Sequence, residues 1–454
     1  MTLTAAAENA RTLAAALGID EEGAAALLNI AAQVTPSSEA GAVALGREVV
    51  DILSRTFSDV GTETSQTPAV EIVIGAAEPR TDAPVIWVTS DEGMVRISRV
   101  RPARRAFTQL HGALNVVVAC YACSAAATVA IPGLAPTRET IQFCISDLAL
   151  PSQMWSDEVQ LDATYLAGAG AVGNGFIWAL RHFRLRGQLD IVDPDDVSSG
   201  NLNRQVWFGG DDVEKPKAER LALHAQPYFP YLALVPHKGE LQSLKNPVDP
   251  WWLKRLIVGV DSRRVRRHLQ GELPREVYDA STTGIEEVVL HFNRQPNGLA
   301  CLGCIYHETP RERAREEHVA EALGVTADDV ATGRIGADAA ALIAARYGRE
   351  AKAIEGMAYD SLFKELCGQK ALMVEGQQVL APFAFVSVLA GALLAIEMVA
   401  RLVDAGRRDR FNYWRVSPWH PFQIRQRQVR GRIPTCEICG DPHIEAVCRE
   451  LWAT

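Results

Sequence analysis

A glycine-rich turn between an apolar strand and a helix restricts the folds open to this chain more than any other feature. The strand-like run 162–167 leads into Gly168-Ala-Gly170-Ala-Val-Gly173, and helix-favouring sequence follows over 174–183. Glycines let the backbone approach a phosphate, and the free N–H groups of a helix N-terminus attract that anion. A second apolar run, 189–192, ends in Asp193, where a carboxylate can bond ribose hydroxyls. Alone, this pattern predicts a nucleotide-binding parallel sheet and also fits an NAD-dependent dehydrogenase.

Cationic side chains beyond the second strand favour a nucleoside triphosphate over NAD. Arg204 follows the strand closely, and Lys217 comes soon after it. A triphosphate needs such cations because charge on its β- and γ-phosphates must be neutralised as pyrophosphate leaves. A third apolar strand, 256–260, ends in Asp261, and a carboxylate at the C-terminal end of a strand suits Mg²⁺. The sequence therefore predicts ATP and Mg²⁺ as ligands. The alternative is that Arg204 and Lys217 are solvated surface charges.

In this order the motifs resemble those of the ThiF/MoeB/ubiquitin-activating superfamily of adenylating enzymes. The family motif D-x-D-x-V-x-x-S-N-L-N-R-Q is matched by Asp193, Asp195, Val197 and the run 201–205. The match extends from about residue 161 to 304 and resumes over 379–439. The resemblance implies that Asp193 holds the ribose and that Asn201, Arg204 and Lys217 contact the triphosphate. It also implies that Asp261 coordinates Mg²⁺.

The chain departs from the family pattern at three positions without losing a charge. Gly200 replaces the usual Ser, Ala171 a frequent Gly, and Ser262 a frequent Asn. The family also places an arginine from a partner subunit or a sister domain against the γ-phosphate. The candidates for that arginine here are Arg11 and the cluster Arg99, Arg101, Arg104 and Arg105.

Four cysteines form two C-x-x-C pairs typical of structural zinc. They are Cys301, Cys304, Cys436 and Cys439. The gap between the pairs is wider than in an ordinary zinc finger, but the resemblance implies that the sheet brings them together. We therefore expect Zn²⁺ to join the C-terminal tail to the domain. The alternative is four unrelated buried thiols.

Cys367 is the candidate nucleophile among the remaining cysteines. Lys364 and Lys370 lie near it in sequence, and neighbouring cations favour a thiolate. Ubiquitin-activating enzymes that form a thioester carry their cysteine in a comparable insertion, so the resemblance implies a catalytic role for Cys367. The alternative is a small buried residue on a helix. Cys120 and Cys123 lie in an apolar run and are interpreted as core residues.

The chain is long enough for more than one domain. Its 454 residues are 48% hydrophobic and 22% charged, with a net charge of −9, which argues against nucleic-acid binding through bulk electrostatics. We predict an N-terminal α/β domain over 1–150, interpretable as a degenerate adenylation half. A Rossmann-like adenylation domain follows over 151–304 and 380–454, with a helical insertion over 305–379. The apolar runs 113–134 and 379–399 are interpreted as related buried helices rather than membrane spans, which predicts a cytoplasmic protein.

The expected reaction begins with ATP-dependent adenylation of the C-terminal carboxylate of a ubiquitin-like protein. Cys367 then forms a thioester that passes to a conjugating enzyme. The predicted layout resembles the activating enzymes of bacterial ubiquitin-like conjugation operons, which implies a role in antiviral defence. The alternatives are a sulfur-carrier or peptide adenylyltransferase of the molybdopterin, thiamine or microcin type without a catalytic cysteine, and a dead binding scaffold. A homodimer is common in the superfamily, although an internal sister half removes the need for one.

Overall fold

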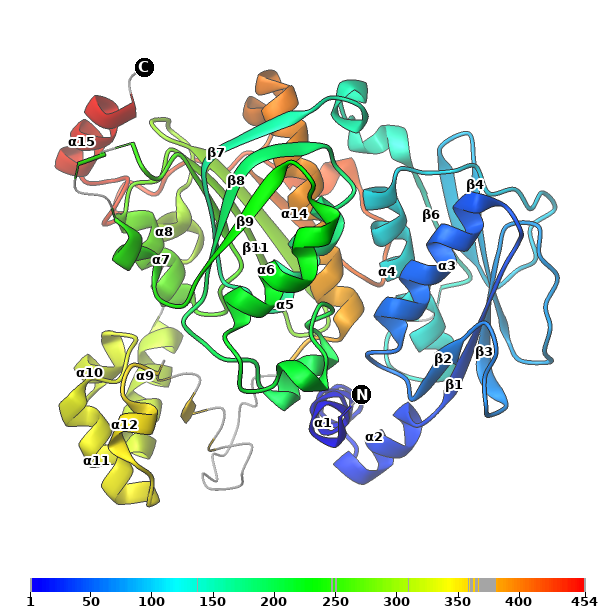
Figure 1. The fold of residues 1–454 in the computed structure, drawn as a ribbon, viewed down its shortest axis with the longest axis horizontal. Helices are drawn as coiled ribbons and strands as arrows, with labels where there is room; N and C mark the ends of the chain where they lie inside the picture. The colour runs from blue at the N-terminus through cyan, green and yellow to red at the C-terminus, as the bar shows by residue number, and fades with distance from the viewer. Residues whose placement is uncertain are drawn as a thin grey trace.

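Two α/β halves lie side by side in the computed structural model, each built around its own sheet (Figure 1). The structure describes residues 2–136, 138–245, 248–249, 251–308, 310–357, 359, 362–363, 366 and 381–452. The green and orange elements of Figure 1 form the larger half, and the blue and cyan elements form the N-terminal half. The predicted α/β fold class with Rossmann-like strands is confirmed.

In the larger half, the described strands form a sheet in the order β14-β13-β12-β11-β10-β7-β8-β9. Strands β11, β10, β7, β8 and β9 run parallel, while β12, β13 and β14 pair antiparallel. The strands are β7 (Val159–Ala167), β8 (Leu185–Val192), β9 (Leu232–His237), β10 (Arg255–Val258), β11 (Glu276–Thr283), β12 (Glu287–Arg294), β13 (Tyr413–Val416) and β14 (Arg427–Gln428). The helices packed with them are α5 (Ala171–Leu180), α6 (Lys217–Ala225), α7 (Arg263–Gly271), α8 (Leu302–Ile305), α14 (Ala384–Val403) and α15 (Pro442–Trp452). Helix α5 begins three residues earlier than predicted because its first turn starts within the glycine motif itself.

The described strands of the N-terminal half form a second sheet in the order β2-β1-β3-β4-β5-β6. They are β1 (Ala31–Pro36), β2 (Asp59–Gly61), β3 (Pro68–Ile74), β4 (Val85–Asp91), β5 (Met94–Ser98) and β6 (Thr140–Cys144). The helices are α1 (Leu3–Leu17), α2 (Glu21–Leu28), α3 (Ala40–Leu53) and α4 (Gly112–Ala130).

The N-terminal sheet repeats the topology of the larger one. Its order β2-β1-β3-β4-β5-β6 corresponds to β8-β7-β10-β11-β12-β13, with every pair in the same parallel or antiparallel sense. Helix α3 follows β1 as α5 follows β7, and α4 lies between β5 and β6 as α14 lies between β12 and β13. The two apolar runs noted in the sequence, 113–134 and 379–399, therefore correspond to helices α4 and α14, which occupy equivalent positions in the two topologies.

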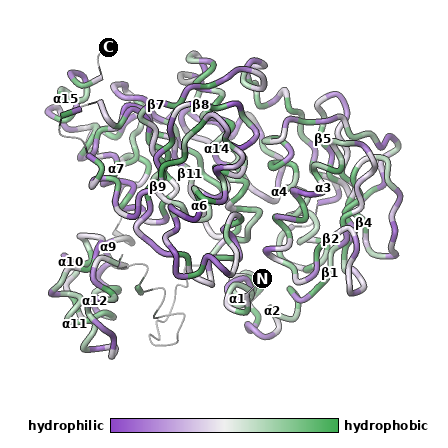
Figure 2. Tube along the Cα trace, in the orientation of Figure 1, coloured by the Kyte–Doolittle hydropathy of each residue, from purple (hydrophilic) through white to green (hydrophobic). Residues whose placement is uncertain are grey.

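Helices α3, α4, α5 and α14 fill the space between the sheets (Figure 1). Helices α4 and α14 are long and apolar enough to cross a membrane, yet 78% and 89% of their apolar windows are buried inside the protein. Their apolar character continues around the helix because both sides face protein, as the hydropathy in Figure 2 shows for α14. A Cβ at Gly391 of α14 would lie 2.2 Å from the Phe176 nitrogen of α5, so this crossing admits no side chain there.

A buried carboxylate ties the two halves together. Glu48 of α3 accepts hydrogen bonds from Trp178 Nε1 of α5 and from Nη2 of Arg181, the C-cap residue of that helix, both at 2.7 Å. His182 Nε2 lies 3.4 Å away. Burial alone would raise the pKa of Glu48, but the hydrogen bond from His182 and the charge of Arg181 outweigh it and lower the pKa below 4.5.

The insertion between β12 and α14 forms a separate helical cluster, yellow in Figure 1. It contains α9 (Pro310–Leu323), α10 (Ala327–Ala331), α11 (Ala337–Tyr347) and α12 (Ala351–Ile354) around its own apolar core, which confirms its helical character. Two ion pairs join this cluster to the larger half: Arg264 of α7 pairs with Glu316, and Arg334 of the insertion pairs with Glu240.

We expect Glu48→Gln to destabilise the protein by about 3 kcal/mol, because the Arg181 guanidinium loses its buried counterion. Because the pKa of Glu48 in the folded state lies below its unfolded value, the stabilisation is present above about pH 4.5. It is lost as pH falls through the folded pKa. Urea unfolding should show a large difference from wild type at pH 7, and this difference should shrink as the pH is lowered below about 4.5. Glu63→Gln, an exposed loop change, is the control, and equal stability of the two variants at pH 7 would contradict the expectation.

Candidate functional site

The glycine-rich turn lies at the carboxyl end of β7, against the end of β10. Gly168 has φ +100°, and a Cβ there would come 2.8 Å from the Gly259 carbonyl carbon. A Cβ on Gly173 would lie 2.1 Å from the Gly168 oxygen. Gly170, the N-cap of α5, meets nothing closer than 3.9 Å. The turn is therefore closed toward the sheet and open at the helix N-terminus, as phosphate binding requires.

Asn174, in the first turn of α5, holds this turn in shape. Its Nδ2 donates to the carbonyls of Ala169 and Gly170 at 2.8 and 3.0 Å, and its Oδ1 accepts from the Trp207 N–H at 3.0 Å. The side chain is fully buried. Asn174 thus connects the glycine turn to the loop that follows Arg204. Sequence reasoning missed this residue, although a polar side chain within a buried apolar helix is a usable signal.

Asp193 follows β8 and faces the glycine turn. Its two oxygens accept from the Ala169 and Asp195 N–H groups at 2.7 and 2.9 Å. Burial raises its pKa, and the charge of Lys217 opposes that change. In the described contacts, this carboxylate orients the turn and the start of the following loop.

Lys217 and Arg204 are not solvated surface charges. Lys217 is 8% exposed, and its Nζ lies 3.0 Å from Asp195 Oδ2. Burial would lower its pKa, but the carboxylates of Asp193 and Asp195 outweigh it and raise the pKa. Arg204 donates to Asn203 Oδ1 at 2.7 Å and to Asn201 Oδ1 at 3.0 Å. Arg204 is half-buried, and burial lowers its pKa.

Asp261 lies at the same edge of the sheet, just beyond β10. It is exposed, and its charge acts on both Arg204 and Lys217. One accessible carboxylate beside a phosphate-binding turn fits Mg²⁺, which keeps several waters and takes its other oxygens from substrate phosphates.

The N-terminal half contributes directly to this edge. Arg55 donates to the carbonyls of Leu202, Val206 and Phe208 at 2.9 to 3.0 Å, which fixes the loop that carries Arg204. On α1, Asn9 Oδ1 accepts from Asn203 Nδ2 at 2.8 Å. Neither contact was expected from the sequence, because each joins residues more than 140 positions apart.

The candidate arginines separate into two groups. Arg11 lies on α1, which packs along the 3₁₀ turn Ser199–Asn203 at the site. Arg101 and Arg105 instead pair with Glu78, and Arg104 pairs with Asp91, all within the N-terminal half. The geometry therefore favours Arg11 over that cluster.

The four cysteines of the two C-x-x-C pairs meet in space. Their sulfurs lie within 4.8 Å of one another, and the Cys301–Cys436 and Cys304–Cys439 separations are 3.7 and 3.3 Å. A tetrahedral zinc site with Zn–S bonds of ~2.3 Å has S–S edges of about 3.8 Å. The donor set and spacing therefore fit Zn²⁺.

Cys367 lies outside the described residues, so its role stays a prediction. Cys120 and Cys123 are buried in α4, and burial raises the pKa of both thiols, as expected of core cysteines.

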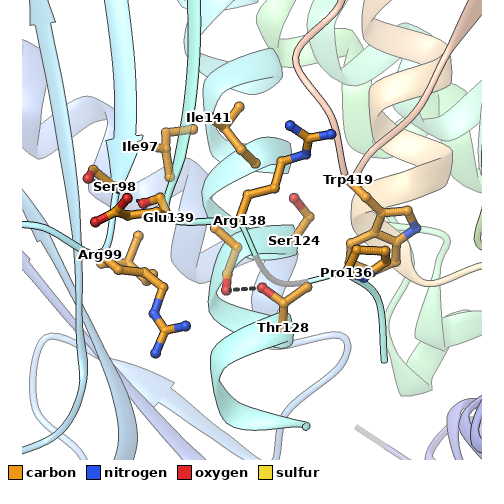
Figure 3. Close-up of a pocket in the computed structure, with 12 residues that line it drawn as sticks. Ile97, Ser98, Arg99, Ser124, Thr128, Pro136, Arg138, Glu139, Ile141 and Trp419 are labelled. Carbon is orange, nitrogen blue, oxygen red and sulfur yellow. Dashed lines mark hydrogen bonds between the residues drawn. The ribbon is translucent and has the colours of Figure 1, made fainter. Parts of the chain in front are cut away.

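Two hollows lie away from the nucleotide edge. Figure 3 shows one between β5, β6, α4 and Trp419, where Arg138 and Ile141 come from the N-terminal half. Its volume of about 10 Å³ holds one water at most. The other, about 350 Å³, lies at the opposite end of β11, beside Asn293 and Trp452.

Comparison with known proteins agrees with this geometry. A model of the ThiF family matches residues 160–438, and a model of the E1 N-terminal domain matches residues 2–143. "Uncharacterized protein y4jF" of Sinorhizobium fredii is 26% identical over 74% of this chain and 68% of its own length. The NEDD8-activating enzyme E1 catalytic subunit of Saccharomyces cerevisiae is 34% identical over 23% of this chain and 35% of its own length.

This chain thus spans about a third of that yeast enzyme. A crystal structure of E. coli MccB aligns with a TM-score of 0.35 and 17% identity, over 62% of this chain and 66% of that one. The ThiF model covers more than half of the chain, including the glycine turn, Arg204, Lys217 and three of the four cysteines, Cys301, Cys304 and Cys436. The chain therefore belongs to the ThiF family and is an adenylyltransferase of the ubiquitin-activating type.

Proposed function

We propose that this chain adenylates the C-terminal carboxylate of a ubiquitin-like protein. The observation that carries the proposal is a pair of cations, the half-buried Arg204 and the buried Lys217, beside an open glycine turn. A nicotinamide cofactor has no γ-phosphate and needs no such pair, whereas ATP does. Asn201, which orients Arg204, and Asp193, which orients the turn, complete the nucleotide site.

In the proposed reaction, a carboxylate oxygen of the carrier attacks the α-phosphorus of ATP. A new P–O bond gives the acyl-adenylate, and the bond between the α-phosphorus and its bridging oxygen breaks as pyrophosphate leaves. Arg204 and Lys217 stabilise the charge that develops on the leaving group, and they act strongly because hydrogen bonds and ion pairs hold them in place before the reaction. Asp261 holds Mg²⁺ against the same phosphates.

The N-terminal half is best interpreted as a degenerate adenylation half. It repeats the topology of the larger half, yet β2 is three residues long and Thr62 follows it where Asp193 follows β8. The space beside Gly75, equivalent to Gly259, is filled: a Cβ there would lie 2.6 Å from Ser37 Oγ and 2.9 Å from Glu39 Oε2. An acidic side chain in that position repels a phosphate.

This half supports the active one instead of binding nucleotide itself. It supplies Arg55, Asn9 and the candidate γ-phosphate arginine, Arg11, to the loop that carries Arg204. A second copy of the chain is then not needed to complete the site, so a homodimer is not part of the proposed unit.

Cys367 is the proposed thioester nucleophile, in the insertion between β12 and α14. Its thiolate sulfur would attack the acyl carbon of the adenylate, a thioester would form, and AMP would leave. The carrier would then pass to a conjugating enzyme, in the cytoplasm, where thiols stay reduced. A role in bacterial ubiquitin-like conjugation and antiviral defence is the corresponding biological proposal. The alternative is a sulfur-carrier or peptide adenylyltransferase that stops at the adenylate.

Adenylation is tested by ATP–pyrophosphate exchange with purified chain, Mg²⁺ and a ubiquitin-like protein encoded beside it. We expect Arg204→Ala and Lys217→Ala each to lower kcat/KM by about 100-fold, the usual cost of removing one group that stabilises a developing anion. Lys215→Ala is the matched control because Lys215 is exposed two positions before Lys217. Exchange that survives both substitutions would contradict the proposed clamp.

The same mixture, resolved on a non-reducing gel, tests the second step. A reductant-sensitive adduct in wild type that disappears in Cys367→Ala supports a thioester-forming enzyme. Pyrophosphate exchange without an adduct in wild type favours the carrier or peptide adenylyltransferase.

Zinc is the proposed occupant of the four-cysteine cluster, where it would join α8 to the tail before α15. We expect about one zinc per chain by elemental analysis. Cys436→Ser should lose the metal and lower the unfolding temperature by about 5–10 °C, because the binding free energy of a structural metal is folding free energy. Cys144→Ser, outside the cluster, should keep both. The assignment would be contradicted if purified wild type contained no zinc and Cys436→Ser had the same unfolding temperature as wild type.

A further inference from the structure

A carboxylate of the N-terminal half, Glu8, lies beside the loop that carries Arg204. Glu8 of α1 pairs with Arg11 at 3.1 Å between Oε1 and Nη2, and both side chains are 27% exposed. Helix α1 is held at the site by the bond between Asn9 and Asn203, and by Thr2 Oγ1, which donates to the Ser199 carbonyl at 3.1 Å. Glu8 is thus fixed beside the loop that carries Arg204.

Gly200 provides the space that Glu8 occupies. A Cβ on Gly200 would come 3.3 Å from Glu8 Cγ and 3.4 Å from Glu8 Oε1, so even alanine would press on this side chain. This is the position where the sequence departs from the Ser of the family motif. The Gly200 carbonyl oxygen also lies 3.5 Å from Arg204 Nη1. Gly200 therefore contacts both the Glu8 side chain and the Arg204 guanidinium.

The electrostatic environment of Arg204 agrees with this placement. Two carboxylates, Glu8 and Asp261, favour its charged form against the effect of burial. Burying part of a guanidinium is costly without an anion nearby, so Glu8 and Asp261 offset this cost when no phosphate is bound.

We propose that Glu8 is a stand-in for the nucleotide phosphates, holding Arg11 and Arg204 in place until ATP displaces it. Glu8 is then a positioning residue: it keeps the cations pre-arranged, it weakens ATP binding by competing for them, and it helps pyrophosphate to leave. This inference rests on the proposed function, because it takes the triphosphate as the ligand of this edge.

The test measures equilibrium binding of a non-hydrolysable ATP analogue with Mg²⁺ to the full chain, by calorimetry. We expect Glu8→Gln to bind about three- to tenfold more tightly, the scale of one partly exposed ion pair. Inhibition by pyrophosphate should strengthen by a similar factor, while AMP, which lacks the displacing phosphates, should bind unchanged. Glu22→Gln on α2, exposed and away from the site, is the control.

A purely structural Glu8 would give the opposite result, with weaker ATP binding and a lower unfolding temperature. Gly200→Ala is the second variant, because its methyl group displaces Glu8 without changing charge, and it should also tighten ATP binding. Unchanged or weaker binding in both variants would overturn the inference. If wild type itself fails to bind the analogue, the proposed function fails; if wild type binds and the variants match it, only the role of Glu8 fails.

Discussion

The close crossing of α5 and α14 sets the arrangement on which the rest of the structure depends. A Cβ at Gly175 of α5 would lie 2.8 Å from the Val388 Cα of α14, and Gly391 approaches α5 even more closely. The same helix α5 begins at the glycine turn, so this contact fixes the direction in which its N-terminal N–H groups point. Because α5 also carries the partners of Glu48, and α14 packs on α4, the crossing positions both the phosphate site and the N-terminal half.

Charge balance is the second constraint, because the site removes most of Lys217 and part of Arg204 from water. Lys217 is balanced by Asp193 and Asp195, and Arg204 by the amide oxygens of Asn201 and Asn203 with two more distant carboxylates. These partners keep the cations charged and oriented before any nucleotide arrives. The acids that balance these cations also compete with the phosphates for them. A change that strengthens this balance therefore stabilises the protein but weakens nucleotide binding.

The sequence predicted the parts of this protein that depend on local pattern. The glycine turn, Asp193, the two cations and the paired cysteines were recognisable because each motif is short and chemically specific. Contacts between segments distant in the chain were not, since nothing near Asn9 or Arg55 indicates that each bonds a loop beyond residue 200. Glu48 was missed for the same reason, because its partners belong to the other half. The correspondence of the two sheets was suspected from two apolar helices alone, and strand order was needed to define it.

The central claim is that one chain holds one nucleotide site, built on the larger half and supported by the N-terminal half. The most direct measurement is a calorimetric titration with a non-hydrolysable ATP analogue and Mg²⁺, combined with the molecular mass in solution. The account predicts one nucleotide per chain in a monomer, with binding lost in Lys217→Ala. Two nucleotides per chain would mean that both halves are competent, and one nucleotide per two chains would mean that the site needs a second copy. Either result would contradict the claim.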